Sequence, residues 1–280
     1  MSLETKIYQK ENSGSIGKIL RESLADIWNS RFLSRQLAER DIKAQYRQSY
    51  FGLIWAFVTP LLTAAAWIFL NISGTIKISE TGLPYPVYVF SGTLIWSILI
   101  ESINSPSQST NSARGILSKI NFPKEALVIS GIYKLLFNSA IKILLLVVIV
   151  FLFGIGFHWS LLLFPFAIIG ALIFGTTLGL FLTPIGMLYK DVAKFVSMGL
   201  RFLMFITPVL YTIPDTGIMR TLMELNPLTS LVITSRDMIT GNTPDFLFTY
   251  LGVTLLSVPL FLIALIAYRI SIPIIVERNA

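Results

Sequence analysis

Long hydrophobic runs separated by polar segments dominate the chain. Six runs are apolar and nearly continuous, and about 20 such residues suffice for a helix to cross the hydrocarbon core of a bilayer. Lipid offers the backbone no hydrogen-bond partner, so each run is predicted to be a helix, and continuous rather than alternating hydrophobicity argues against a barrel. The predicted spans are residues 52–70, 87–105, 135–153, 161–182, 195–211 and 247–267.

The composition agrees with a membrane protein. Of 280 residues, 54% are hydrophobic and 13% charged, whereas soluble domains carry about 25% charged residues. The mean hydropathy is +0.72. The absence of cysteine excludes disulfides and thiolate sites. The first 50 residues hold no early apolar run of the kind that begins a secretory signal, so the N-terminus is expected to stay in the cytoplasm.

The basic residues predict the orientation of the chain. Nine Lys and Arg residues precede the first span, four lie in the second-to-third connection, two in the fourth-to-fifth connection and two in the tail. The remaining connections carry only Lys77, Arg220 and Arg236. Because basic loops stay in the cytoplasm, both termini are predicted to be cytoplasmic, and the net charge of +7 needs no nucleic-acid partner.

Two units are expected along the chain. Residues 1–48 form a cytoplasmic segment containing a charged interfacial helix at 29–47, and residues 49–280 form the membrane domain. The cytoplasmic stretch 106–127 is expected to be polar with a short helical core. The outer stretch 213–246 is long and moderately apolar, so it is expected to form short re-entrant helices that dip into the outer leaflet. The predicted fold is therefore an all-α polytopic membrane protein.

Catalytic and nucleotide-binding motifs are missing from the sequence. No HExxH or GxSxG pattern occurs, and His158 is expected to be a solvated loop residue. Gly17-Lys18 is the closest match to a P-loop, but Asn12 stands where the first glycine belongs and Ile19 where Ser or Thr belongs. The chain is therefore expected to be no enzyme, and any ATP-driven transport needs a separate ATPase.

Four segments carry a resemblance to a known family. They are RDIKAQYRQSYFGLIWAFVTPLL at 40–62, FPKEAL at 122–127, LYKDV at 188–192, and LNPL at 225–228 after the proline-rich FITPVLYTIP. In this order they resemble the membrane subunit of the ABC-2 class of polysaccharide exporters, which move O-antigen, capsule or teichoic-acid chains. The motifs do not specify the polymer.

The resemblance implies a homodimer of six-span subunits in the bacterial cytoplasmic (inner) membrane. Two copies of a separate ABC ATPase would hold ATP and Mg, and this chain would hold no cofactor or metal. The substrate would be a lipid-linked polysaccharide such as O-antigen. The alternatives are an ABC-2 exporter of teichoic acid, lipid or drug, and an ion-coupled secondary carrier. A carrier is disfavoured because Glu101 is the only acid in any predicted span and no inverted repeat is visible.

Two segments are candidates for contact with the ATPase. The 29–47 helix is interpreted as a gate helix, with a headgroup helix attracted to anionic lipid as the alternative. Residues 112–124 are interpreted as a coupling segment, with an ordinary polar loop as the alternative. The candidate interface residues are Arg40, Arg47, Ser112, Arg114, Lys119, Phe122, Pro123, Lys124 and Glu125.

Charged and aromatic residues within the spans are candidates for the transport path. Glu101, Lys142 and Arg201 lie about 6–12 Å inside the cytoplasmic boundary, counted at about 1.5 Å per residue. We predict one charged layer in which Glu101 pairs with Lys142 or Arg201, with snorkelling of the cations as the alternative. Aromatic rings can stack on sugar C–H faces, although any one of them can instead be a lipid-facing belt residue. The aromatic candidates are Trp67, Phe69, Tyr88, Trp96, Phe137, Phe202, Phe205 and Tyr211.

A small-residue motif predicts close helix packing. Gly175 and Gly179 stand four residues apart in the fourth predicted span. Small residues at this spacing let two helix backbones approach each other in a membrane.

Overall fold

A computed structural model describes residues 16–47, 51–74, 81–117, 119–120 and 122–279. The described residues form helices and no strands. In chain order the elements are α1 (Ile16–Asn29), α2 (Arg31–Arg47), η1 (Gly52–Ile54), α3 (Trp55–Ile72), α4 (Tyr85–Ser112), α5 (Arg114–Leu117), α6 (Glu125–Leu152), η2 (Trp159–Leu162), α7 (Phe164–Leu188), α8 (Lys190–Leu203), η3 (Met204–Ile206), α9 (Ile218–Leu225), α10 (Pro227–Thr240) and α11 (Leu247–Asn279).

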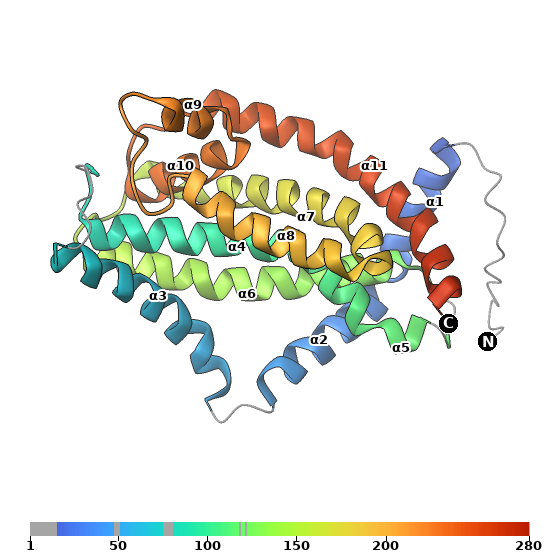
Figure 1. The fold of residues 1–280 in the computed structure, drawn as a ribbon. Coiled ribbons are helices and arrows are strands. Elements are labelled where there is room, and N and C mark those ends of the chain that lie inside the picture. Colours follow the sequence, from blue (N-terminus) through green and yellow to red (C-terminus); the bar gives the residue numbers. More distant parts are fainter. Residues whose placement is uncertain (1–15, 48–50, 75–80, 118, 121, 280) are drawn as a thin grey trace.

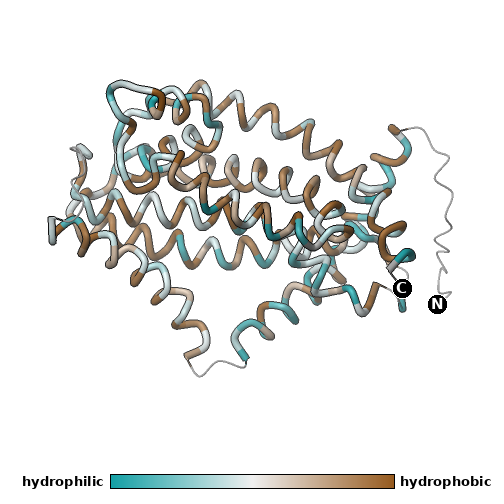
Figure 2. Tube along the Cα trace, in the orientation of Figure 1, coloured by the Kyte–Doolittle hydropathy of each residue, from teal (hydrophilic) through white to brown (hydrophobic). Residues whose placement is uncertain are grey.

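The long helices lie side by side in one bundle (Figure 1). Among the described residues, five helical segments are long and apolar enough to cross a membrane: Gly52–Ile72, Tyr85–Ser112, Glu125–Leu152, Phe164–Leu188 and Leu247–Arg278. Hydrophobic residues follow these helices along their length, while α2 is mostly hydrophilic (Figure 2). The chain is therefore an all-helical, multi-pass membrane protein.

The helix predicted at 195–211 has different bounds in the structure. Helix α8 begins earlier, at Lys190, and only the turn η3 continues it to Ile206. Thr207 is extended, and residues 207–211 are not helical. The sequence contains the reason, because the residue before Pro208 is disfavoured in the helical region. The two segments together hold 17 residues.

The polar stretch 106–127 also differs from the prediction. Its first residues continue α4 through Pro106 as far as Ser112, and only α5 is a separate short helix. The hydroxyls here bond within the helix or to a neighbour. Thr110 Oγ1 donates to the carbonyl of Pro106 at 2.7 Å and lies 2.7 Å from the hydroxyl of Tyr268. Such internal bonds let a polar sequence remain helical against a packed partner.

Helix α4 is the centre of the bundle and packs along α6 and α7. The close approach to α7 depends on the predicted glycines. A Cβ atom at Gly179 would lie 2.2 Å from the carbonyl oxygen of Ile103, and one at Gly175 would lie 1.6 Å from Ser102 Oγ. The structure therefore confirms that Gly175 and Gly179 allow close helix packing.

Helices α9 and α10 lie together at the end of the bundle where α4 and α11 begin (Figure 1). Asn226 caps α10 by accepting from the Leu228 amide at 3.0 Å, and Pro227 occupies the first turn. Gly241, with φ +83°, ends α10 against the ring of His158. The expectation that His158 is simply solvated is wrong, since its Nδ1 is buried and has no hydrogen-bond partner among the described residues.

Arg236 of α10 is buried, although it is an arginine in a connection between membrane helices. Its guanidinium donates to the carbonyls of Pro208 at 3.0 Å and Val209 at 2.9 Å and to Ser91 Oγ at 3.2 Å. It also lies over the ring of Tyr88, 3.8 Å from the centroid. Arg236 therefore satisfies carbonyl groups that the break after α8 leaves without helical partners.

Candidate functional site

A cavity of about 850 Å³ lies among α2, α4, α6, α8 and η3. Its wall combines carboxamide, hydroxyl and charged side chains with a few aromatic and aliphatic ones. The lining residues are Gln45, Trp96, Ser97, Ile100, Glu101, Asn104, Gln108, Lys134, Asn138, Ser197, Leu200, Arg201, Met204 and Phe205. A cavity of this size, with polar groups placed among apolar ones, can hold a ligand that has both hydroxyl groups and apolar faces.

Polar stripes on α4 and α6 supply six of the residues of this wall. On α4 the stripe is Ser97, Glu101, Asn104 and Gln108, with spacings of four, three and four residues. Residues at this spacing share one face of a helix. On α6, Lys134, Asn138 and Lys142 repeat every four residues. Our sequence reasoning missed the amide and hydroxyl residues of these stripes, although their periodicity could have revealed them.

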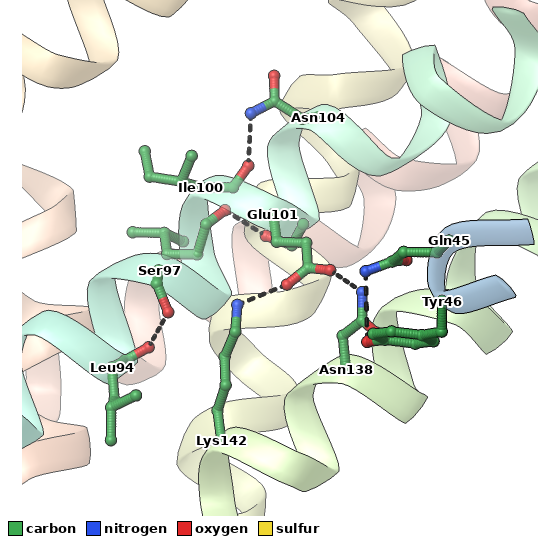
Figure 3. Close-up of polar contacts among 11 residues, drawn as sticks. Gln45, Tyr46, Leu94, Ser97, Ile100, Glu101, Asn104, Asn138 and Lys142 are labelled. Atoms are coloured by element: carbon green, nitrogen blue, oxygen red, sulfur yellow. Dashed lines mark hydrogen bonds and ion pairs between the residues drawn. The ribbon is translucent and has the colours of Figure 1, made fainter. Parts of the chain in front are cut away.

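Glu101 lies at the junction of the two stripes (Figure 3). Lys142 Nζ is 2.6 Å from Glu101 Oε2, and the side-chain amide of Asn138 donates to Glu101 Oε1. Both charged side chains are mostly buried, with 17% and 21% of their surface exposed. The predicted pairing of Glu101 with Lys142 is therefore confirmed. Intramembrane charges need such partners because isolated charge is costly there.

The carboxylate is linked through Asn138 to the end of α2. Tyr46 is at hydrogen-bond distance from Asn138, its hydroxyl 3.4 Å from Oδ1, and Gln45 Nε2 lies 3.3 Å from the same hydroxyl. Figure 3 shows both α2 side chains reaching toward α6. A chain of polar contacts thus joins α2 to the ion pair at the cavity wall.

The predicted path residues divide into two groups. Trp96, Glu101, Arg201 and Phe205 line the cavity, and Lys142 contacts it through Glu101. Five others lie elsewhere, for reasons of packing that spacing along the chain does not show. These are Trp67, packed against the core; Tyr88 and Tyr211, joined by a hydrogen bond from the Tyr88 hydroxyl to the Tyr211 carbonyl; and Phe137 and Phe202, exposed on the outside of the bundle.

Phe69 of the aromatic candidates is also an outward residue. It lies near the end of α3, 70% exposed. The alternative interpretation of a lipid-facing aromatic fits this position better than a path residue.

Most of the predicted interface residues lie at the end of the bundle that holds α1 and the last turns of α11, whereas Arg47 ends α2 next to Tyr46, near the middle of α6. Arg40, Arg47, Ser112, Arg114 and Lys119 are exposed. Lys124 Nζ lies 4.9 Å above the centroid of the Phe122 ring, beside Pro123, and partial burial lowers the pKa of Lys124 from its ordinary value. These residues are available for contact with another protein.

Glu125 does not fit the prediction that it contacts a partner. It is 1% exposed, accepts a hydrogen bond from Ser23 Oγ at 2.6 Å and is paired with Arg269. Arg269 also contacts Asp26 at 2.8 Å and Glu22 at 3.7 Å. The side chain points inward because one guanidinium gathers three carboxylates, and this cluster joins α1, α6 and α11.

The fold is that of a multi-pass membrane protein with a cavity among its helices, and comparison with known proteins supplies the class. Residues 33–239 match the family model of the ABC-2 type transporter. The chain belongs to the ABC-2 transporter membrane family.

Three relatives share most of their length with this chain. It is 29% identical over 210 residues to the O-antigen export system permease protein RfbA of Myxococcus xanthus. The aligned region covers 74% of this chain and 80% of the relative. It is 24% identical over 247 residues to a protein of the same name from Klebsiella pneumoniae, covering 84% and 92%. A second Klebsiella pneumoniae protein of that name is 23% identical over 210 residues, covering 72% and 78%.

Proposed function

We propose that this chain is the channel-forming membrane subunit of an ATP-driven exporter that moves a lipid-linked polysaccharide, such as O-antigen, out of the cytoplasm. The observation that carries the proposal is the cavity of about 850 Å³ among α2, α4, α6 and α8, which is lined by both polar and apolar side chains. The names of the three relatives, all O-antigen export permeases, support the choice of substrate.

The wall of the cavity suits a polymer that must slide. Hydroxyl and carboxamide groups such as Ser97, Asn104 and Gln108 can exchange hydrogen bonds with successive sugar hydroxyls. Trp96 and Phe205 add flat apolar rings to the same wall. The charge of Lys142 is balanced by that of Glu101, so this ion pair adds no net charge to the wall, whereas Lys134 and Arg201 of the same wall have no ion pair among the described residues.

The proposed topology has six crossings with both termini in the cytoplasm of a bacterium, and the protein lies in the inner membrane. Helix α8 with η3 forms the fifth crossing, since 17 helical residues reach about 25 Å. Helices α9 and α10 re-enter the outer leaflet. The distribution of basic residues supports this orientation. Residues 1–48 then form a cytoplasmic segment, and residues 49–280 form the membrane domain.

The proposed assembly is a homodimer with two copies of an ABC ATPase. Family membership implies the ATPase partner, which would hold the ATP and Mg. The exposed side chains of α2 and of residues 112–124 are the proposed contacts. Two exposed apolar surfaces support a second copy of this chain. Only 6% of the residues in the apolar stretch of α3 are buried. Phe195, Met198 and Phe202 of α8 are also exposed.

The proposal is tested in a strain that lacks this gene. We expect lipid-linked polymer to accumulate in the cytoplasm and to reach the surface again when the wild-type chain is supplied. Asn104→Trp should fail to restore export because its side chain fills the cavity. Leu144→Trp, on an exposed side of α6, is the matched control and should restore export. Normal surface polymer in the deletion strain would refute the proposal.

A further inference from the structure

A second, smaller cavity adjoins the large one. It has a volume of about 90 Å³ and lies between α4, the second half of α7 and the first half of α8. Asn104 of α4 and Ser197 of α8 line both cavities. A substituent of a molecule held in the large cavity can therefore reach the small one by passing between these two residues.

The part of this small cavity away from α4, which we call the side pocket together with its α4 wall, is apolar. It is lined by Leu182 and Gly186 of α7 and by Val192, Ala193 and Val196 of α8. Small residues keep it open, because a Cβ atom added at Gly186 would have its nearest contact with the Cβ atom of Ala193, at 3.8 Å. The side pocket therefore has room for a small apolar group.

Two polar groups on the α4 wall have opposite hydrogen-bonding capacity. Asn104 Nδ2 donates to the carbonyl of Ile100 at 3.0 Å, so the carboxamide oxygen of Asn104 faces away from that carbonyl (Figure 3). Ser107 Oγ accepts from Asn111 Nδ2 at 3.3 Å, which leaves its hydroxyl proton to donate. Among the described residues, no donor reaches Asn104 Oδ1 and no acceptor takes the Ser107 proton.

The spacing of these two groups matches a single amide. Asn104 and Ser107 are three residues apart on one face of α4, and side chains at this spacing have Cβ atoms about 5–6 Å apart. An amide between them can donate its N–H to Asn104 and accept from Ser107 through its oxygen.

The volume of the side pocket indicates a group of the same size. A cavity of about 150 Å³ holds a benzene ring, and a water molecule occupies about 30 Å³. A volume of about 90 Å³ is therefore too small for a sugar ring. It is sufficient for about three or four non-hydrogen atoms.

We propose that the side pocket receives the acetamido group of an N-acetylated amino sugar, while the sugar rings stay in the large cavity. The acetamido N–H donates to Asn104 Oδ1, its carbonyl accepts from Ser107, and its methyl group lies against Gly186 and Ala193. A lipid acyl chain or the methyl group of a deoxy sugar would pair with neither polar group. This inference rests on the proposed export of a polysaccharide and names a sugar that the polysaccharide contains.

The first test compares two disaccharides on the purified full-length chain in lipid nanodiscs. N,N′-diacetylchitobiose and cellobiose have the same rings and linkage and differ in the acetamido groups. We expect saturation-transfer NMR to show tighter binding of the acetylated sugar, with most saturation on its methyl protons. Equal affinity of the two sugars would overturn the proposal. Tighter binding of L-rhamnose than of N-acetylglucosamine would also overturn it, in favour of a deoxy sugar.

The second test changes the side pocket itself. Gly186→Ala places a methyl group in it, so binding of diacetylchitobiose should weaken about tenfold while binding of cellobiose stays unchanged. Gly199→Ala is the matched control, because it makes the same change in α8 where a Cβ atom meets nothing within 4 Å. Alanine favours a helix over glycine, so both variants should fold, which thermal unfolding checks. Equal binding of diacetylchitobiose by the two variants would overturn the proposal.

A third variant tests the polar wall. Ser107→Ala removes the proposed donor, so it should reduce the preference for diacetylchitobiose over cellobiose, and an unchanged preference would contradict the role of Ser107. Failure of this inference differs from failure of the proposed function. A deletion strain that accumulates polymer, together with a purified chain that binds both disaccharides equally, would refute the acetamido site alone.

Discussion

Lys142 Nζ lies 2.6 Å from Glu101 Oε2, and this ion pair joins α6 to α4 at the wall of the polar cavity. The carboxylate also accepts from Asn138, whose own oxygen lies near the hydroxyl of Tyr46 on α2. The Glu101 carboxylate therefore connects α4 directly to α6, and through Asn138 it connects both helices to α2.

Breaking the ion pair should cost more than reversing it. Glu101→Gln leaves the Lys142 ammonium mostly buried without a carboxylate, so we expect the free energy of unfolding to fall by about 1.5–3 kcal/mol. The double change Glu101→Lys with Lys142→Glu should recover part of this loss. Thermal unfolding in detergent measures the stability of all three variants, and export by the complemented strain measures function. The pairing is wrong if the double change is no better than either single change.

Tyr46 should control the position of α2 more than the stability of the fold. Tyr46→Phe removes a single hydroxyl whose contact with Asn138 is long, at 3.4 Å. We expect a loss of stability below about 1 kcal/mol but faster hydrogen exchange at the amides of residues 43–47. Tyr133→Phe, an exposed tyrosine of α6, is the control. Unchanged exchange in Tyr46→Phe would show that this contact does not hold α2.

Gly179 should not tolerate even one methyl group. A Cβ atom there would lie 2.2 Å from the backbone oxygen of Ile103, which cannot rotate away. We expect Gly179→Ala to destabilise the protein by about 1–3 kcal/mol. Gly252→Ala in α11 is the control, because a Cβ atom there meets nothing within 4 Å. Equal melting temperatures for the two variants would contradict the close packing of α4 on α7.

Arg236 should be needed to hold the turn after α8. Arg236 holds Ser91, Pro208 and Val209 with three different nitrogens, and Arg236→Lys replaces these with a single nitrogen, so the three acceptors can no longer all keep their partners. We expect a loss of about 1–3 kcal/mol and faster hydrogen exchange at residues 209–211. Arg220→Gln, an exposed residue paired with Glu224, should change stability by less than about 0.5 kcal/mol. Equal effects of the two substitutions would argue against this role.

The cluster around Arg269 should respond asymmetrically to the loss of charge. Arg269→Gln leaves Glu22, Asp26 and Glu125 gathered without a cation, so we expect a loss of about 3 kcal/mol or more. Glu125→Gln removes one of three carboxylates around a single guanidinium and keeps an oxygen to accept from Ser23, so its effect should be smaller. Chemical or thermal unfolding of both variants in detergent tests this order. A larger effect for Glu125→Gln would contradict it.

The sequence by itself determined the class of fold and much of its chemistry. Hydrophobic runs are a direct consequence of the bilayer as a solvent, so the five long apolar helices could be predicted from length and hydropathy. The same physics singled out Glu101 and Lys142, because a charge within a span needs a partner. The small size of Gly175 and Gly179 likewise predicted that this helix packs closely against another. In each of these cases the property that decides the outcome, which is hydrophobicity, charge or size, belongs to residues within one helix and can be recognised from that segment of the sequence.

Only the tertiary structure decided which polar groups meet. Glu125 and Arg269 are 144 residues apart, and Arg236 and Ser91 are 145 apart, so no spacing rule relates them. Burial of Arg236 and Glu125 depends on helices that are distant in sequence closing over them. The same holds for the cavity, whose wall takes single faces from α2, α4, α6 and α8. Periodicity can show that Asn104 and Gln108 share a face, but the packing angles of the bundle determine that this face meets a cavity rather than lipid or core.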